Sequence, residues 1–217
     1  MELMQVCNLI ELSENYIKNA LNSSFSDGHD FDHTCRVVKH ALALCDQIPE
    51  ADRNIVHLAA ILHDVARPQE FQSKGAIDHA AAGAIIARDF LLQHTSCEIA
   101  DRVAQAISQH RYRSGNTPST IEAKILYDAD KLDSLGAVGI ARSFMFAAKA
   151  GAKLHNSAQD ALAGNAYSSE DTAYREYLVK LSKLSGKMLT APGKKRADTL
   201  SAFMKTFFNQ LNSEIFD

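Results

Sequence analysis

The stretch "ADRNIVHLAAILHDVARP", residues 51–68, shows most clearly which kind of fold this chain builds. Its apolar residues recur at helical spacing, which predicts an amphipathic helix with one buried face. That face ends in His63 and Asp64, and Arg67 and Pro68 then close the segment, because proline disrupts a continuing helix. Since a carboxylate beside a buried face needs a partner, the end of this helix predicts a binding site as well as a fold.

The same helical spacing recurs along the rest of the chain. Alternating patterns that predict β-strands are scarce, so the predicted fold class is all-α. No stretch rich in Pro, Gly and Ser divides the 217 residues, and we therefore predict a single domain over residues 1–217. Other predicted helices include residues 77–94, residues 97–111 and C-terminal helices within residues 172–217.

Two features interrupt the pattern in the second half of the chain. Residues 119–150 predict one long helix, which Gly136 and Gly139 bend or divide because glycine is a poor helix former. Residues 151–171 are polar, lack helical spacing and are long for a plain connector. We therefore predict a loop or lid near a site at residues 151–171, with a disordered stretch as the alternative.

The charge of the chain argues against a nucleic-acid polymer as its partner. The net charge is -3, and the isoelectric point near 6.3 indicates no basic field that would hold a phosphate backbone. The N-terminus is acidic where a signal peptide is positive, and no apolar run reaches membrane-spanning length. We therefore predict a cytoplasmic protein with no membrane partner.

The cysteines give no sign of a metal site. Cys7, Cys35, Cys45 and Cys97 form no CxxC pair, the spacing that is typical of thiolate ligands. In a reducing compartment such cysteines are small core residues, so we expect neither disulfides nor a thiolate metal site.

Polar side chains lie where three separate predicted helices should contribute to the core. His33 follows "HDFD", His63 and Asp64 end their helix, and Asp130 lies within "DADKLD". Carboxylates in apolar surroundings imply a cation, ion pairs or a water-lined cleft. Imidazole and carboxylate without thiolate suit divalent manganese, iron, cobalt, nickel or zinc. The residues by themselves leave two alternatives, a metal centre or a set of structural ion pairs and solvent-facing charges.

The ordered set "GHDFDHTCRV", "AAILHDVA" and "AKILYDADKLDSLGAVGIAR" resembles the HD-domain metal-dependent phosphohydrolase superfamily, which is named for its His-Asp doublet. The resemblance implies a single-domain HD-type helical bundle. It also implies that His33, His63, Asp64 and Asp130 together bind one divalent metal ion, with magnesium as a further candidate. The later "REYLVKLSKLSGKML" extends the likeness towards the small bacterial nucleotide pyrophosphohydrolase-like subset that includes YedJ and YpgQ.

Two more histidines, His79 and His110, fall where two-metal members of the superfamily place additional ligands. They could hold a second ion. In the YedJ-like subset, however, the position of His79 is commonly a small hydroxyl residue, so this chain departs from that pattern. We therefore assign His79 and His110 to substrate binding or to support of the ligands.

A phosphorylated substrate needs positive donors close to the metal ion. Arg36 lies three residues after His33 on the same helical face, and Lys131 directly follows Asp130. We assign Arg36 and Lys131 to substrate binding and catalysis, since charge-assisted hydrogen bonds hold phosphate oxygens. Asp64 is the third predicted catalytic residue, because its carboxylate could orient the attacking water.

Three other charged residues have alternative roles. Arg67 is a further candidate for phosphate binding, although a surface cation paired with a neighbouring carboxylate is the simpler interpretation. Asp133 is either support for a ligand or a helix-surface charge. Asp30 precedes His33 and could orient its imidazole ring.

The expected chemistry is hydrolysis of a phosphoester or phosphoanhydride, because a divalent ion activates water and neutralises phosphoryl charge. The resemblance implies a nucleotide substrate, with nucleoside triphosphate converted to monophosphate and pyrophosphate. Three alternatives are a nucleoside 5'-monophosphate phosphatase, a di-iron HD-fold oxygenase and a non-catalytic nucleotide sensor. A small phosphorylated molecule is thus the expected partner, and a homodimer is left open.

Overall fold

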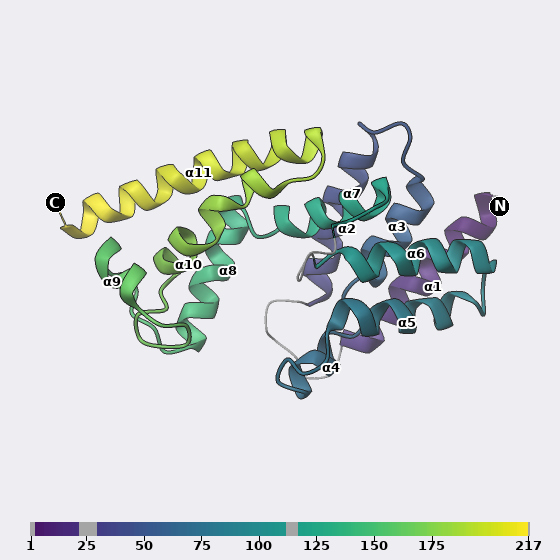
Figure 1. Cartoon of the computed structure of the whole chain (residues 1–217), viewed down its shortest axis with the longest axis horizontal. Coiled ribbons are helices and arrows are strands. Elements are labelled where there is room, and N and C mark those ends of the chain that lie inside the picture. The colour runs from purple at the N-terminus through teal and green to yellow at the C-terminus, as the bar shows by residue number, and fades with distance from the viewer. Residues whose placement is uncertain (1–2, 22–29, 112–116, 217) are drawn as a thin grey trace. The chain divides into compact units, whose positions relative to one another are not determined.

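The computed structural model of this chain describes residues 3–21, 30–111 and 117–216 (Figure 1). The regular elements in these ranges are helices and none is a strand, so the predicted all-α class is confirmed. The chain forms two compact units, Met1–Asp130 and Lys131–Asp217. The single domain over residues 1–217 stays a prediction.

The first unit is built around α3, whose residues Ile55, Leu58, Ile61 and Leu62 are fully buried. Their spacing of three and one residues gives one continuous apolar face. α3 packs against α1, α2 and α6, and α5 runs beside α6 (Figure 1). The helices are α1 (Leu3–Leu21), α2 (Phe31–Cys45), α3 (Arg53–Leu62), α4 (Arg67–Gln72), α5 (His79–Leu91), α6 (Cys97–Gln109) and α7 (Ile121–Leu132), the last of which crosses the boundary between the units.

Short acidic side chains start two of the helices that carry predicted site residues. Asp30 caps α2 by accepting the backbone N–H of His33 at 2.9 Å. Asp78 caps α5 by accepting the backbone N–H of Ala80 at 2.8 Å. A carboxylate in this position satisfies a free helical N–H and stabilises the helix start. The caps place His33 in the first turn of α2 and His79 at the first residue of α5.

The helix predicted within residues 51–68 is shorter in the structure. α3 ends at Leu62, and His63 is its C-cap residue. The prediction that Pro68 closes this helix is wrong, because Pro68 lies in the first turn of α4, where a missing N–H breaks no hydrogen bond. His63 and Asp64 therefore lie at the joint between two helices.

In the second unit, α8 packs against α10 and α11, and α9 packs against α10. The long helix predicted over residues 119–150 is divided, because Gly136 has a φ of 66°, which other residues rarely adopt. At Gly139 a Cβ would lie 2.1 Å from the carbonyl oxygen of Ser134. The elements are α8 (Gly136–Lys149), α9 (Ala158–Ala163), α10 (Ala173–Val179), the 3-10 turns η1 (Leu181–Lys183) and η2 (Ser185–Lys187), and α11 (Ala191–Phe216).

The segment 151–171 is more ordered than its sequence pattern indicates. It contains α9, and hydrogen bonds hold its two ends together. Nδ2 of Asn156 donates to the backbone oxygen of Glu170 at 3.1 Å, and the hydroxyl of Thr172 donates to Oδ1 of Asn156 at 2.8 Å. These contacts argue against a disordered stretch, while the role of a lid stays a prediction.

The cysteines do not all lie in the core. Cys45 is buried on α2, whereas Cys7, Cys35 and Cys97 are exposed. The prediction of small core residues is therefore wrong for these three. On α2 the reason is the helical period, since Cys35 follows the buried Thr34 and faces away from the side that packs.

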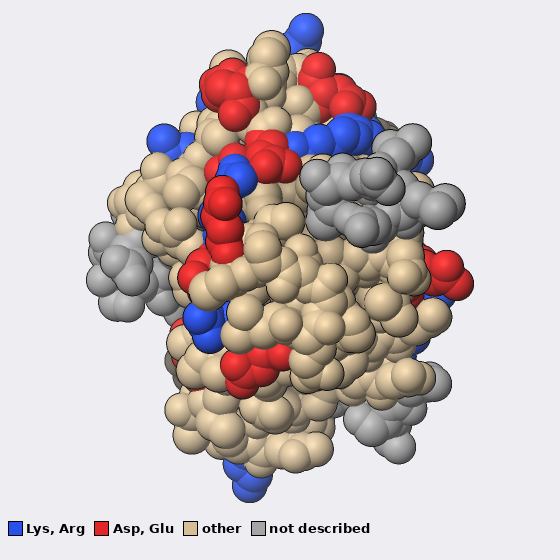
Figure 2. Space-filling model, turned by 90° about the vertical axis from the view of Figure 1, so that its right-hand side faces the viewer, with Lys and Arg blue, Asp and Glu red and all other residues tan. Residues whose placement is uncertain are grey.

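Charges of both signs are mixed on one face of the molecule. On the face shown in Figure 2, Lys and Arg lie among Asp and Glu in small groups separated by larger areas of other residues. Within the ranges that the structure describes, no helix combines the length and the apolar character needed to cross a bilayer.

Candidate metal centre

The four predicted metal ligands come together in the first unit. His33 is on α2, His63 and Asp64 follow α3, and Asp130 is near the end of α7. His33, His63 and Asp64 are buried, and Asp130 is partly exposed. Residues far apart in the sequence thus contribute imidazole nitrogen and carboxylate oxygen to one place.

The ligand atoms of these residues face one another at short range. Nε2 of His33 lies 3.4 Å from Nε2 of His63 and 3.6 Å from Oδ2 of Asp64. It also lies 3.6 Å from Oδ1 of Asp130, and Nε2 of His63 lies 3.5 Å from Oδ2 of Asp64. Two atoms that bind one ion at about 2.1 Å in a tetrahedral arrangement are about 3.4 Å apart, so this spacing fits a divalent metal ion.

The hydrogen bond of His63 indicates which of its nitrogen atoms is the ligand. Nδ1 lies 2.9 Å from the carbonyl oxygen of Ala60, and because a carbonyl only accepts, Nδ1 must carry the proton. In a neutral ring Nε2 then has a lone pair directed at the Nε2 of His33 and at a carboxylate oxygen. Acceptors that converge in this way repel one another unless a proton or cation lies among them, so the residues fit a metal ion.

A second group of ligand atoms adjoins the first through Asp64. Oδ1 of Asp64 lies 3.3 Å from Nε2 of His79 and 4.0 Å from Nε2 of His110. The two Nε2 atoms are 3.2 Å apart. All three residues are buried, and their ligand atoms are close enough together to hold one metal ion. The assignment of His79 and His110 to substrate binding or ligand support stays a prediction.

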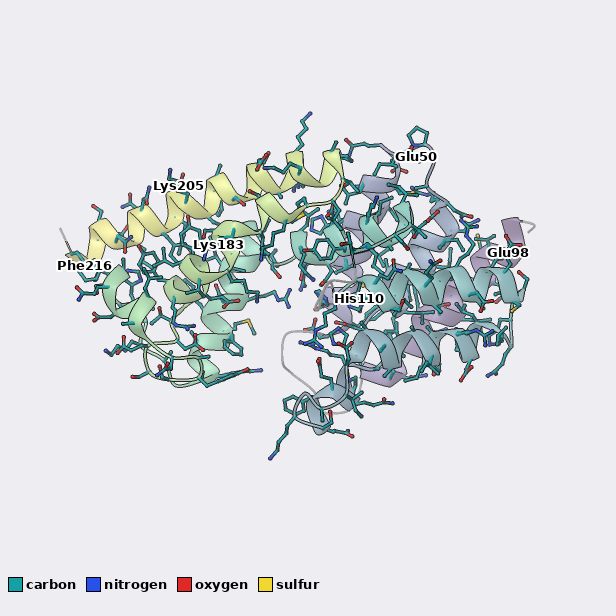
Figure 3. The ribbon with its side chains drawn as sticks, viewed as in Figure 1. Glu50, Glu98, His110, Lys183, Lys205 and Phe216 are labelled. Atoms are coloured by element: carbon teal, nitrogen blue, oxygen red, sulfur yellow. The ribbon has the colours of Figure 1, made fainter. Side chains whose placement is uncertain are left out.

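The histidines of the second group are held in the neutral state. His110 is the C-cap residue of α6 and lies at the end of that helix opposite Glu98 (Figure 3). Burial, and then the neighbouring His63, lowers the pKa of His110 to about 3. Burial also lowers the pKa of His79, although the charge of Asp64 opposes the shift. Neutral imidazole is the form that binds metal ions, so both rings suit that role at neutral pH.

Two residues outside the predicted set of site residues, Glu70 and Arg111, contact this second group. Oε2 of Glu70 lies 2.7 Å from Nδ1 of His79 and 2.6 Å from Nη1 of Arg67, and Arg111 donates to Oε1. Burial raises the pKa of Glu70, but the hydrogen bond from Arg111 and the nearby charges outweigh it and lower the pKa overall. The pairing of Arg67 with a neighbouring carboxylate is therefore confirmed.

The predicted phosphate-binding cations lie on helices that also carry predicted ligands. Arg36 is on α2, one turn after His33, and Lys131 follows Asp130 on α7. Both side chains are partly buried rather than fully solvated. Their roles in substrate binding and catalysis stay predictions.

The two carboxylates expected to support the site have clear structural roles. Asp30 accepts the backbone N–H of His33, so it positions that residue by capping α2. Asp133 is buried, and its Oδ2 accepts a hydrogen bond from Nη1 of Arg142 at 2.5 Å. The interpretation of Asp133 as a helix-surface charge is therefore wrong.

An all-α bundle with two adjoining buried groups of imidazole and carboxylate ligands defines a protein that can bind divalent metal ions. Residues 30–135 match the family model of the HD domain. The uncharacterized protein YpgQ of Bacillus subtilis (strain 168) is 34% identical over 197 residues, which are 88% of this chain and 86% of that protein. The chain therefore belongs to the HD superfamily of metal-dependent phosphohydrolases, as its motifs indicated.

Solved structures show the same fold. The crystal structure of Bacillus subtilis YpgQ in complex with ADP has a TM-score of 0.76 and 28% identity, and covers 98% of this chain and 97% of that one. An HD-superfamily hydrolase from Bacillus thuringiensis has a TM-score of 0.75 and 30% identity, and covers 96% and 97%. A predicted HD superfamily hydrolase from an uncultured Thermotogales bacterium has a TM-score of 0.69 and 25% identity, and covers 99% of both chains.

Proposed function

We propose that this protein hydrolyses nucleotides at the group formed by His33, His63, Asp64 and Asp130, with a divalent metal ion as cofactor. One observation carries the proposal: the ligand atoms of the other three residues lie within 3.6 Å of Nε2 of His33. Burying such a set is unfavourable unless a cation offsets the repulsion among its members. The HD family of the chain supports the same assignment.

The donor set is compatible with manganese, iron, cobalt, nickel, zinc or magnesium, because it combines imidazole nitrogen with carboxylate oxygen. When bound, the ion supplies a Lewis acid that activates water and offsets the negative charge of phosphate oxygens. The chain contributes the ring orientation, since the hydrogen bond from Nδ1 of His63 to Ala60 directs Nε2 at the site.

Asp64 connects the two groups of ligand atoms. Its Oδ2 faces His33 and His63, and its Oδ1 faces His79. A carboxylate in this position can bind the ion through one oxygen and accept a hydrogen bond from the attacking water through the other. We therefore propose a second role for Asp64, the orientation of that water.

The nucleotide as substrate class is supported by the YpgQ structure in complex with ADP, because that relative shares the fold over nearly its whole length. We propose that nucleoside triphosphate is split to monophosphate and pyrophosphate. Arg36 and Lys131 are the proposed donors to phosphate oxygens, since each lies next to a proposed ligand in its helix. His79 and His110 are proposed to face the substrate or to support the ligands.

The partner expected with this chemistry is a small phosphorylated molecule. The mixed surface charge in Figure 2 and the net charge of -3 are consistent with a protein that does not bind a nucleic-acid polymer. A cytoplasmic location without a membrane partner belongs to the same proposal, and a homodimer is compatible with it.

The proposal is tested by incubating the purified protein with nucleoside mono-, di- and triphosphates in the presence of manganese, cobalt, nickel or magnesium. Product analysis separates the two hydrolytic hypotheses, because a pyrophosphohydrolase releases pyrophosphate and a monophosphate phosphatase releases phosphate. We expect pyrophosphate release from triphosphates, with loss of activity in His63→Ala and Asp130→Ala. Undiminished release in both variants would show that the site is assigned wrongly.

A further inference from the structure

The buried carboxylate of Glu70 lies behind His79, on the side of the ring away from Asp64. Oε2 of Glu70 is 2.7 Å from Nδ1 of His79, while Nε2 of the same ring is 3.3 Å from Oδ1 of Asp64. The imidazole thus lies between two carboxylates, one on each nitrogen. Glu70 is on α4 and His79 begins α5, so the contact joins two short neighbouring helices.

The short contact decides which nitrogen of His79 carries the proton. A carboxylate oxygen and an unprotonated imidazole nitrogen are both acceptors, so a separation of 2.7 Å requires a hydrogen atom between them. Nδ1 of His79 therefore donates to Glu70. The neutral ring then presents an unprotonated Nε2 towards Asp64 and His110.

His110 is oriented in the same way by a different acceptor. Its Nδ1 lies 2.6 Å from the carbonyl oxygen of Ile107, so Nδ1 donates and Nε2 is unprotonated in the neutral ring. The Nε2 atoms of His79 and His110 are 3.2 Å apart. Together with Oδ1 of Asp64 they form a buried cluster of acceptors, and such a cluster favours a cation over a phosphate oxygen.

The guanidinium groups of Arg67 and Arg111 donate to Glu70, and they also lie close enough to Nδ1 of His79 to compete with the carboxylate for that nitrogen. Nη1 of Arg67 donates to Oε2 of Glu70 at 2.6 Å, and Arg111 donates to Oε1. The Nη1 atoms of both arginines lie 3.2 Å from Nδ1 of His79. Arginine only donates, so without the carboxylate these groups would favour an unprotonated Nδ1 and move the ring proton to Nε2.

We propose that Glu70 is a positioning residue, which keeps His79 in the Nδ1–H form so that Nε2 remains a ligand beside Asp64 and His110. Arg67 and Arg111 fix the carboxylate in place and balance its charge. A carboxylate that accepts from the far nitrogen of a ligating imidazole sets the ring orientation and strengthens metal binding. This assignment rests on the proposed metal chemistry of the site and departs from the proposed function in one respect, because it gives His79 and His110 to a second cation beside Asp64 rather than to the substrate.

The ring form of His79 is the direct test. Imidazole nitrogen chemical shifts of 15N-histidine-labelled, metal-free protein at neutral pH distinguish the two neutral forms, with His79→Gln used to assign the signals. We expect the Nδ1–H form in the wild type and in Glu70→Gln, whose amide oxygen still accepts. In Glu70→Ala we expect a shift towards the Nε2–H form. An unchanged Nδ1–H form in Glu70→Ala would overturn the proposal.

Cation affinity gives a second measurement that needs no nucleotide. Equilibrium dialysis against Mn²⁺ alone should show affinity about 10- to 100-fold lower in Glu70→Ala than in the wild type. Glu70→Gln should lose less, because it keeps the acceptor. These measurements omit substrate, so they test the role of Glu70 even if the protein does not hydrolyse nucleotides. Conversely, the hydrolysis assay tests the proposed function even if Glu70 has no effect on His79.

Glu122 provides a matched control. Glu70 and Glu122 are each 8% exposed, and Glu122 also accepts from an arginine, with Nη2 of Arg102 at 3.2 Å. Glu122→Ala should therefore reproduce the loss of a buried ion pair without changing Mn²⁺ affinity or the His79 signals. Circular dichroism checks that each variant is folded. Equal Mn²⁺ affinity in folded Glu70→Ala and Glu122→Ala would show that Glu70 is only structural.

Discussion

One buried polar group in the first compact unit is arranged in the opposite way to one in the second. In the first unit, ligand atoms face ligand atoms: Nε2 of His79 lies 3.2 Å from Nε2 of His110. In the second unit, donors face acceptors: Asp171 accepts the backbone N–H of Tyr167 at 2.7 Å and Nη1 of Arg175 at 3.0 Å. The first arrangement needs a cation or a proton to be stable, and the second does not.

This contrast gives a criterion for locating a binding site in a helical protein. Matched donors and acceptors, such as Asp171 with Arg175, stabilise the fold and leave little to bind. Converging acceptors are unfavourable for the fold by itself and are retained where a ligand completes them. The comparison therefore supports the metal binding that we propose for the first unit, and four predictions test it, from the largest expected effect to the smallest.

The largest effect should follow from removing one charge in the first unit. Asp64→Asn keeps the shape of the side chain but removes the charge that faces both groups of ligands, so phosphohydrolase activity should fall by about 10³-fold. Asn212→Ala is the counterpart in the second unit, where Asn212 accepts from His155 at 2.7 Å. It should lower stability while leaving kcat nearly unchanged. Equal loss of kcat in the two variants would contradict the different roles that we propose for the two units.

The pH dependence of stability should come from the neutral histidines of the first unit. Burial lowers the pKa of His110 from 6.5 to about 3 and lowers that of His79. Below about pH 6.5 the unfolded chain therefore binds more protons than the folded chain. The stabilisation that depends on neutral His110 is complete above the unfolded pKa of 6.5, and it is lost as the pH falls towards about 3. Each such group adds a slope of up to about 1.4 kcal/mol per pH unit.

Urea unfolding of the metal-free protein at several values between about pH 7 and pH 4 measures this slope. His110→Gln should flatten it, because one of the groups that take up a proton on unfolding is removed. Carboxylates distant from His110 contribute equally to both proteins and cancel in the difference. If the wild type and His110→Gln lose stability in parallel, His110 is not held neutral by burial.

A change in the aromatic core of the second unit should affect stability alone. Phe208 is fully buried, and its ring stacks on Tyr177 with 4.5 Å between the centroids. Phe208→Leu should lower the free energy of unfolding by about 1–2 kcal/mol, because it removes apolar contacts and leaves a small cavity. Urea titration gives this value, and Mn²⁺ affinity is the control. A large loss of Mn²⁺ affinity in the folded variant would contradict the separate roles of the units.

The smallest effect is expected for an exposed ion pair. Lys194 and Asp198 lie one turn apart on α11, and Nζ of Lys194 is 2.5 Å from Oδ1 of Asp198. Exposed pairs of this kind contribute little, because solvent screens them and two flexible side chains must be ordered. Lys194→Ala should therefore change the unfolding midpoint only slightly. A loss several times larger would mean that surface charge, rather than the aromatic core, stabilises this unit.

Some corrections show what spacing along one helix cannot reveal. Pro68 looked like a terminator and instead lies in the first turn of α4. Exposed Cys35 and buried Thr34 are neighbours, and their difference depends on which side of α2 packs.

The sequence by itself determined the all-α class, because the period of apolar residues reflects local helix geometry and the need to bury one face. Through its motifs it also indicated the family and the four proposed ligands. Only the tertiary structure decided that Oδ1 of Asp64 faces His79 and that Glu70 and Arg111 lie behind that ring. These contacts join residues on separate helices, and their distances depend on how the helices pack, which no local pattern encodes.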